Sequence, residues 1–446
     1  MNKLTLATLF SLSFFTLSCL AQPTNECIAH IDDHLDGMNL EFFDCHLTDE
    51  EIPAILNYLQ VHTEVRWLFL KDNQITKKGA IQLAKNKTLY AVSMANNNVG
   101  DEGAIAFANN PQLGFVDLDN NNIGDVGAIA LSRNPNMTEM SLDDNKNITD
   151  IGAIAFGQSK VLDGISLNGA SITDEGAVGL AKNTGFKWLY LDNNKISDVG
   201  VAALTTLPAL NSITLNGNQI GDDGAIALAK NKEYEKLELD NNHIGDEGAK
   251  AISQIKIWFL ILDQNLIGDL GASYLASAKK IDHIYLNSNH ITDIGAKKLA
   301  VNEHVAGLSL DNNPITDETA IAFAKSKSRA YSLSLDNTMI TDTGAIALTN
   351  AHNLLSLSMN NNQLTNASAF ELAKSTSLVV LYVKYNHIGP TGLKALAESK
   401  IRSVYDEGND GVELAAKKSL AKKQLNLAKY CIKNPSNWCR NKQAGN

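Results

Sequence analysis

The chain has 446 residues and a formal net charge of -11 at pH 7, with 49 acidic and 38 basic side chains. This balance argues against nucleic acid as the main partner, because binding to phosphates needs clustered positive charge. Hydrophobic residues make up 44% of the chain, enough for a continuous core, whereas aromatic residues make up only 6%, so their positions are informative.

Residues 1–21 have the pattern of a secretory signal peptide. Lys3 precedes an apolar stretch from Leu4 to Leu17, and Ala21 offers a small residue before a mature start at Gln22. We therefore expect export to a periplasmic, cell-surface or extracellular location. Lipidation of Cys19 is an alternative, but the residues before it fit a lipidation motif poorly. No later stretch is long and apolar enough to span a membrane.

Residues 22–65 are expected to form an N-terminal cap that includes a degenerate copy, Leu40 to Leu56, of the repeat described below. Four cysteines remain after the signal peptide, and they flank the repeats: Cys27, Cys45, Cys431 and Cys439. In an oxidising compartment the simplest pairing is Cys27–Cys45 and Cys431–Cys439, although four cysteines allow three pairings.

Three histidines of the cap, His30, His34 and His46, are close in sequence and suggest a metal site as one interpretation. Surface histidines on a capping segment are the interpretation that we favour, so we predict no metal.

One motif recurs from residue 66 to residue 411 at a spacing of 24 residues, with slips of one: Leu-x-Leu-x-x-Asn-x-Ile-Gly/Thr-Asp-x-Gly-Ala-x-x-Leu-Ala. The two leucines alternate with other residues, which predicts a short strand with the leucines inward. The apolar spacing after Gly-Ala predicts a helix. A fixed period of this length indicates a leucine-rich repeat solenoid, in which each unit packs only on its neighbours.

Two polar columns of the motif are expected to be structural. The Asn should bond backbone groups of its turn and of the adjacent repeat, and the Asp should accept backbone N–H groups at the start of its helix. A metal-binding or catalytic interpretation of the Asp column is less favoured. The Asn column is Asn73, Asn97, Asn121, Asn145, Asn194, Asn218, Asn242, Asn265, Asn289, Asn313, Asn362 and Asn386; the Asp column is Asp101, Asp125, Asp150, Asp174, Asp198, Asp222, Asp246, Asp269, Asp293, Asp317 and Asp342.

The segment Gly-Ala-Ile-Ala-Leu-Ala at 224–229, with relatives at 103–108 and 127–132, resembles ribonuclease-inhibitor-like leucine-rich repeats. More closely it resembles the 24-residue GALA-type repeats of bacterial effectors. The resemblance covers roughly residues 40–410. Since helices are wider than strands, we expect an α/β solenoid: a curved horseshoe with parallel strands on the concave face and helices on the convex face. GALA-type effectors carry an F-box, and residues 22–65 show no obvious one. Listeria-type internalins have a shorter repeat.

Residues 412–446 are expected to form a C-terminal cap helix and a tail. The stretch from Val412 to Tyr430 predicts an amphipathic helix with several basic residues, among them Lys417 and Lys422. We favour a capping role; the alternative is contact of its basic face with a membrane surface.

The concave face is the candidate binding site. Most residues expected to point out from it are small or polar, and the large ones fall into clusters. Such aromatic residues are typical anchors of protein interfaces, although each ring also has a simpler role in covering a neighbouring strand. The candidates are Trp67, Phe69 and Phe115; Trp188 and Tyr190; Phe259, His283 and Tyr285; and Tyr382, Tyr385 and Tyr405.

A row of Asp and Asn residues runs beside these clusters. Stacked carboxylates about 5 Å apart repel one another, and a basic partner, cations or interleaved Asn would relieve the repulsion. We include Asp192, Asp240 and Asp263 in the candidate site; the alternative is that the row only stabilises turns. Calcium fits poorly because the oxygens lie in a line. The row is Asp119, Asp143, Asn168, Asp192, Asn216, Asp240, Asp263, Asn287, Asp311, Asp336 and Asn360.

The sequence has no phosphate-binding glycine loop, nucleophile elbow or His-Glu-x-x-His motif, so we predict no enzyme and no cofactor. We predict an exported, monomeric protein that binds another protein, one with a basic surface, through its concave face. A bacterial effector or virulence-related factor fits this prediction. The rival is a structural envelope protein whose basic C-terminal helix contacts the membrane.

Overall fold

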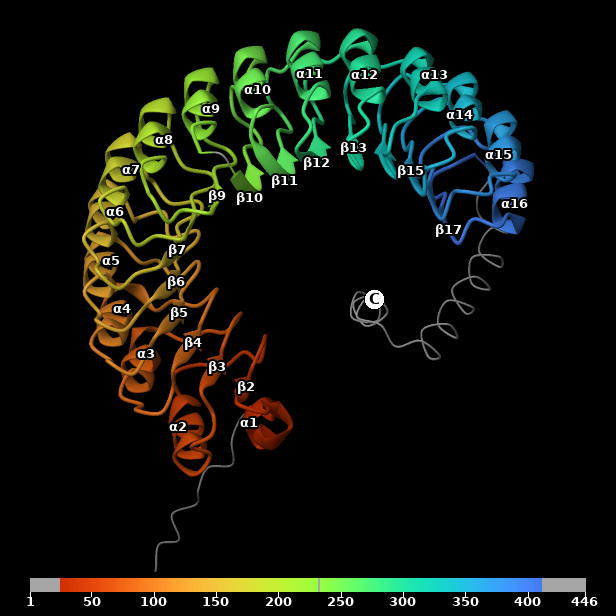
Figure 1. Ribbon diagram of the computed structural model, residues 1–446. Coiled ribbons are helices and arrows are strands. Elements are labelled where there is room, and N and C mark those ends of the chain that lie inside the picture. Colours follow the sequence, from red (N-terminus) through yellow and green to blue (C-terminus); the bar gives the residue numbers. More distant parts are fainter. Residues whose placement is uncertain (1–24, 232, 411–446) are drawn as a thin grey trace, which may run out of the picture.

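The computed structural model describes residues 25–231 and 233–410, and these form one curved α/β solenoid (Figure 1). Seventeen strands of the described chain form a single open sheet that lines the inner side of the arc, and the helices line the outer side. Strand pairs are parallel throughout, except for the antiparallel pair β1–β2. The predicted horseshoe is therefore confirmed. No helix in the described ranges is both long and apolar enough to cross a membrane.

The strands are β1 (Leu35–Asp36), β2 (Asn39–Glu41), β3 (Trp67–Phe69), β4 (Ala91–Ser93), β5 (Phe115–Asp117), β6 (Glu139–Ser141), β7 (Gly164–Ser166), β8 (Trp188–Tyr190), β9 (Ser212–Thr214), β10 (Glu233–Glu238), β11 (Lys256–Ile261), β12 (Ile281–Tyr285), β13 (Gly307–Ser309), β14 (Ser332–Ser334), β15 (Ser356–Ser358), β16 (Val380–Tyr382) and β17 (Ser403–Tyr405). The helices are α1 (Glu26–Ala29), the 3-10 helix η1 (Ile31–His34), α2 (Ile52–Val61), α3 (Lys77–Leu83), α4 (Gly100–Ala108), α5 (Asp125–Leu131), α6 (Asp150–Phe156), α7 (Asp174–Leu180), α8 (Asp198–Leu204), α9 (Asp222–Leu228), α10 (Asp246–Ile252), α11 (Asp269–Ala276), α12 (Asp293–Ala300), α13 (Asp317–Lys325), α14 (Asp342–Leu348), α15 (Asn366–Leu372) and α16 (Pro390–Glu398).

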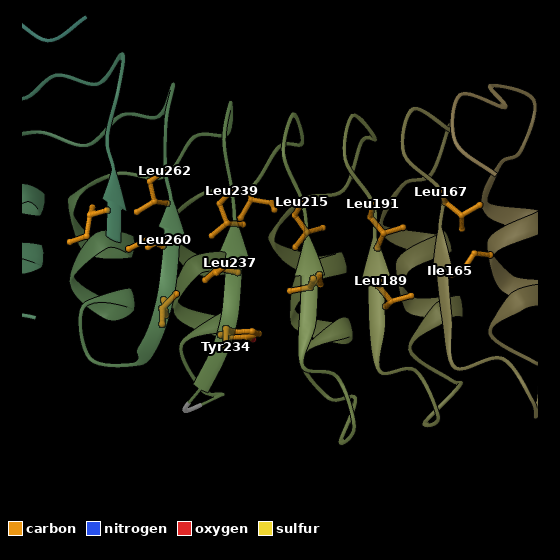
Figure 2. Packing of buried hydrophobic residues seen from close by; sticks show 14 of the residues in the cluster. Ile165, Leu167, Leu189, Leu191, Leu215, Tyr234, Leu237, Leu239, Leu260 and Leu262 are labelled. Atoms are coloured by element: carbon orange, nitrogen blue, oxygen red, sulfur yellow. The ribbon is translucent and has the colours of Figure 1, made fainter. Parts of the chain in front are cut away.

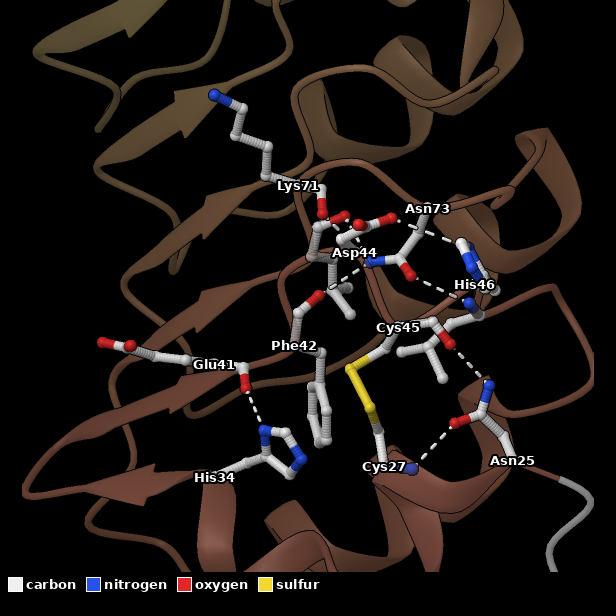
Figure 3. Close-up of a disulfide and its surroundings, with 12 residues drawn as sticks. Asn25, Cys27, His34, Glu41, Phe42, Asp44, Cys45, His46, Lys71 and Asn73 are labelled. Atoms are coloured by element: carbon white, nitrogen blue, oxygen red, sulfur yellow. Dashed lines mark hydrogen bonds and ion pairs between the residues drawn. A yellow bond between two sulfur atoms is a disulfide. The ribbon is translucent and has the colours of Figure 1, made fainter. Parts of the chain in front are cut away.

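The N-terminal end of the array is closed by α1, η1 and the β1–β2 hairpin. Cys27 of α1 is joined to Cys45 by a disulfide with a Cα–Cα distance of 6.1 Å, as predicted (Figure 3). Asn25 secures the same corner, because its side chain donates to the Cys45 carbonyl and accepts from the Cys27 N–H. The signal peptide, the Cys431–Cys439 pair and the predicted helix 412–430 lie outside the described residues.

The prediction of surface histidines in the cap is confirmed for His30 and His46, which are exposed, whereas His34 is half-buried. The His34 ring lies against Phe42 at a centroid distance of 4.8 Å, and its Nδ1 is 2.6 Å from the Glu41 carbonyl oxygen (Figure 3). Among the described residues, the grouping that could hold a metal is Cys27, His34 and Cys45 rather than the three histidines. Since the two sulfurs are bonded to each other, they are not metal ligands in this state.

A continuous hydrophobic core runs between the sheet and the helices. Both motif leucines of β8, Leu189 and Leu191, are fully buried, and so are the corresponding residues of neighbouring repeats (Figure 2). Ile196, which follows the turn, and Leu204, which ends α8, complete the same layer. Burial of each such side chain stabilises the fold by about 1.5–3 kcal/mol.

The motif asparagines connect neighbouring repeats, as predicted. In one repeat, the Asn194 amide donates to the Leu191 carbonyl and also to the Leu167 carbonyl of the preceding repeat, at 3.1 and 2.9 Å. Its side-chain oxygen accepts from the Ile172 N–H, again in the preceding repeat. Each asparagine therefore satisfies buried backbone groups in two turns at once.

The prediction that each motif aspartate caps its own helix is wrong. Ser197 is the N-cap of α8, and Asp198 is the first helical residue. The Asp198 carboxylate instead accepts from the N–H groups of Gly221 and Gly224, at 2.7 and 2.9 Å, so it caps α9 of the next repeat. We call the residues of the Asp column the capping aspartates. The error arises because one aspartate per repeat has the same period whichever helix it caps.

The glycine of the motif lets the aspartate of the preceding repeat approach closely. A Cβ atom at Gly224 would lie 2.6 Å from Asp198 Oδ1 and 2.7 Å from the Ile220 side chain. One repeat has Thr319 at this position, fully buried, and its hydroxyl donates to Asp293 at 2.6 Å. A side chain is thus accommodated at this position when the atom that lies close to the aspartate is a hydroxyl group, which donates a hydrogen bond to it.

We expect Gly224→Val to destabilise the protein more than Gly224→Thr, although the two side chains have nearly the same shape. Only threonine can donate to Asp198, so the valine variant should lose about 1–3 kcal/mol more, the amount typical of an unsatisfied buried polar group. Urea unfolding followed by circular dichroism measures the difference.

The reciprocal change Thr319→Val serves as the control and should also lower the unfolding midpoint. A valine variant as stable as the threonine variant would contradict the proposed role of the Asp198 contact.

Candidate partner-binding face

The concave face presents four columns of side chains, which the parallel strand register aligns from repeat to repeat. Three are the columns expected from the sequence, namely the residues before, between and after the two motif leucines. The strand register places Trp188 beside Gly164 and Ser212, and Tyr190 beside Ser166 and Thr214. A fourth column, two residues before the first leucine, also contributes to the face, and we call it the rim column: it includes Tyr90, Asn211, Trp258, Asp282 and Tyr331.

The first aromatic cluster is larger than predicted. The structure brings Trp67 within ring-centroid distances of 6.2 Å of Phe69 and 5.8 Å of Phe115. It adds Tyr90 from the rim column, 6.0 Å from Trp67, and Phe43 from the cap, 5.8 Å from Phe69. Tyr90 and Phe43 are exposed, so the cluster offers a broad apolar surface at the N-terminal end of the array.

The second cluster consists of Trp188 and Tyr190, whose rings are 4.9 Å apart and half-buried. The indole lies over Gly164, where a Cβ atom would come within 1.9 Å of it. Trp188 therefore covers its neighbour, which is the simpler role considered above, and also remains partly accessible to a partner.

The third cluster differs in membership from the predicted one. Phe259 stacks on His283 at 4.7 Å, and the His283 Nε2 lies 3.0 Å from the hydroxyl of Tyr331, a rim residue that the sequence analysis missed. Tyr285 belongs to the same strand as His283, but no ring contact in the described residues joins it to this stack. Burial raises the pKa of Tyr285, and the nearby Tyr331 and Asp263 raise it further.

The fourth cluster is a stack of Tyr382 on Tyr405 with ring centroids 4.5 Å apart. Tyr385 does not join this stack. It lies in the following turn with a φ of 53° and packs over Gly408, with 59% of its surface exposed. Lys384 extends the stack, because its ammonium group lies 5.8 Å from the Tyr405 ring and 2.6 Å from Glu407.

The row of Asp and Asn side chains has a structural role in the turns. Asp192 accepts from the Asn216 N–H, Asn216 accepts from the Asp240 N–H, and Asp240 accepts from the Asp263 N–H, at 2.8–2.9 Å. Asp263 in turn accepts from the Asn287 N–H at 2.7 Å. One oxygen of each of these side chains is therefore occupied within the protein, which weakens the prediction that the row exists to attract a basic partner.

The carboxylates of this row are electrostatically strained. Burial, followed by the charge of neighbouring Asp263, raises the pKa of Asp240 to about 7. Burial and the charge of Asp117 raise the pKa of Asp119 to about 7, and burial raises the pKa of Asp311 to about 6. The capping aspartate Asp293 behaves oppositely: burial alone would raise its pKa, but hydrogen bonds from Thr316 and Thr319 bring it below the ordinary value.

Comparison with known proteins identifies the repeat. One family model described as leucine rich repeat matches residues 184–244, and a second of the same description matches 85–108, 109–132, 133–157, 279–300 and 374–397. The chain is a leucine-rich repeat protein. The closer resemblance to GALA-type repeats stays a prediction. No curated protein sequence matches this leucine-rich repeat protein at a significant level.

Solved structures share the fold at low sequence identity. An internalin from Listeria monocytogenes is 24% identical over 66% of this chain and 80% of its own, with a TM-score of 0.51. A leucine-rich repeat protein from Leptospira interrogans is 18% identical over 77% and 90%, with a TM-score of 0.50. TLR13, solved in complex with ssRNA13, is 19% identical over 79% of this chain and 54% of its own, with a TM-score of 0.52.

We expect Asp240→Asn to stabilise the leucine-rich repeat protein at pH 8 and to have little effect near pH 4. The folded-state pKa of Asp240, about 7, exceeds the ordinary value of 3.8, so the folded protein holds this proton more tightly than the unfolded chain does. The resulting contribution to folding stability is complete below about pH 4 and is lost as the pH rises through 7. Asparagine retains the hydrogen bond, as Asn216 does in the same row. The gain should be about 1 kcal/mol once solvent screening is allowed for, measured by urea unfolding at both pH values.

Glu303→Gln is the control, because Glu303 is exposed and its substitution removes an equal charge. A gain for Asp240→Asn that is equal at pH 4 and pH 8 would show that the buried charge is not its cause.

Proposed function

We propose that this leucine-rich repeat protein binds a partner protein through the aromatic clusters of its concave face. The observation that carries the proposal is that the fold does not need these rings. Trp188 and Tyr190 occupy positions filled by Gly164 and Ser166 in one neighbouring strand and by Ser212 and Thr214 in the other. The leucine core beneath all three strands is equally complete.

The arrangement of the rings supports the same proposal. Each cluster is held in place by contacts within the protein, through ring stacking and through packing over glycine, so little side-chain freedom remains to be lost on binding. Rigid, partly exposed aromatic residues are the usual energetic centres of protein interfaces. TLR13, which shares the fold, was solved in complex with ssRNA13, but the charge of -11 on this chain favours a protein partner.

Export is part of the proposal. The Cys27–Cys45 disulfide supports it, since such bonds persist in oxidising compartments, and the N-terminal sequence has the pattern of a signal peptide. A role as a secreted effector follows as the functional context. The rival, membrane contact through residues 412–430, concerns a segment outside the described residues.

Replacing each aromatic pair by the residues of an adjacent strand tests the proposal. Trp188→Ser/Tyr190→Thr reproduces β9 at β8, and Trp67→Ala/Phe69→Ser reproduces β4 at β3. Both variants should fold normally, yet a partner captured by the native protein and identified by mass spectrometry should bind at least one of them about 30-fold more weakly, because an interface anchor contributes around 2 kcal/mol.

Val199→Asp on the convex side is the control, since it introduces an exposed residue of the kind found at Asp223 in the next repeat. Retention of full affinity by both concave variants, with loss in the convex variant, would refute binding through the concave face.

A further inference from the structure

A basic pocket opens at the rim of the concave face, where the sheet departs from its regular pattern. Strands β10, β11 and β12 have five or six residues, whereas β3–β9 and β13–β17 have three. The extra residues lengthen the strands at their N-terminal ends, so that Glu233 pairs with Lys256 and Ile257 with Ile281. A pocket of about 310 Å³ lies beside this extension, with Lys256, Trp258, Lys279, Lys280, Asp282 and Arg329 among its lining residues.

The pocket is positive although the protein is acidic. Its lining carries four permanent cations and one carboxylate, Asp282. That carboxylate is already shared, since it lies 3.4 Å from the Arg329 guanidinium and 3.0 Å from His283 Nδ1. Lys256 is paired with Glu233 just outside the lining. Lys279 and Lys280 are exposed, and no ion pair among the described residues involves either of them.

Trp258 forms an apolar wall beside these cations. It is 56% exposed and also borders a second hollow of about 590 Å³, which is lined by Asn211, Glu233 and Phe259 as well. The rim column carries Asn211 and Lys187 in the two regular repeats that precede β10, so the strand fold does not require an indole here. Phe259 connects the wall to His283 and Tyr331 on the sheet.

We infer that this pocket binds the carboxylate side chains of an acidic peptide segment, with an adjacent apolar side chain of that segment packed on Trp258. The inference rests on the proposed function, because it names the chemistry of the protein partner. It also replaces the expectation of a basic partner: the acidic row already accepts internal hydrogen bonds, whereas Lys279 and Lys280 remain available.

A short peptide fits the site better than a long polyanion does. The pocket has room for one or two side chains rather than for a continuous charged backbone. A nucleic acid or sulfated polysaccharide extending beyond the pocket would meet a protein of net charge -11. An acidic segment with an interior aromatic residue matches the neighbouring cations and indole without that repulsion.

The test uses the full chain and two peptides that carry an uncharged dye, Gly-Asp-Glu-Phe-Glu-Asp-Gly and the same peptide with lysine at the four acidic positions. Fluorescence anisotropy should show binding of the acidic peptide at low ionic strength, weakening with added salt, and no binding of the basic peptide. Lys279→Gln/Lys280→Gln should reduce the affinity about tenfold or more, the change expected from loss of charge-assisted hydrogen bonds.

A matched control removes two lysines from the corresponding loop near the N-terminus, as Lys85→Gln/Lys87→Gln, and should leave the affinity unchanged. Trp258→Asn places at this position the asparagine that the rim column has at Asn211, just before β9. This variant should weaken binding of the acidic peptide, but it should not weaken binding of the same peptide without its phenylalanine.

Equal loss in both lysine variants, absence of salt-dependent binding, or tighter binding of a single-stranded DNA of equal charge would overturn the inference. None of these results affects capture of a partner by the aromatic clusters, so failure here is distinguishable from failure of the proposed function.

Discussion

The structure depends on hydrogen bonds that each repeat makes with the next. Three-residue strands leave most of a repeat in turns, whose backbone groups are buried and must be paired. Asn194 accepts a hydrogen bond from a backbone N–H of the preceding turn, and Asp198 accepts one from a backbone N–H at the start of the following helix. No repeat is complete alone, so the ends of the array need other partners. At the N-terminus, Asn25 and the Cys27–Cys45 disulfide hold the residue Cys45, which stands where later repeats have the motif asparagine.

The aspartates of the repeats occur in two environments that shift the pKa of the carboxyl group in opposite directions. A capping aspartate such as Asp293 accepts several hydrogen bonds from one neighbour, and these keep its pKa low despite burial. An aspartate of the acidic row, such as Asp240, lies near other carboxylates, so that burial and repulsion raise its pKa. Interleaved asparagines, for example Asn216 and Asn287, donate to the aspartates beside them and limit this repulsion. The acidic row therefore belongs to the turn structure, which leaves the aromatic and rim columns as the surface proposed for recognition.

The repeat period alone predicts much of this molecule, because residues of one column share one environment. It predicted the buried leucines, the asparagine bonds and the horseshoe. It could not predict which helix Asp198 caps, because a contact within the same repeat and a contact with the next repeat recur at the same spacing in the sequence. It also missed Tyr90, Trp258 and Tyr331, because the outward positions were counted only from the residue before the first leucine. The lengthened strands β10–β12 depart from the period, so the period could not predict them.

The spacing of the clusters constrains how a partner can bind. Phe115, Trp188 and Phe259 lie on β5, β8 and β11, so that these members of the first three clusters are three strands, or about 14 Å, apart. An extended segment of about five residues spans that distance, whereas a single side chain cannot. Near β11 and β12 the concave face also has a charge polarity along the strands, with cations at the rim near Trp258 and carboxylates of the acidic row at the opposite end. A segment bound as proposed would therefore have its acidic side chains toward the rim cations and away from the acidic row.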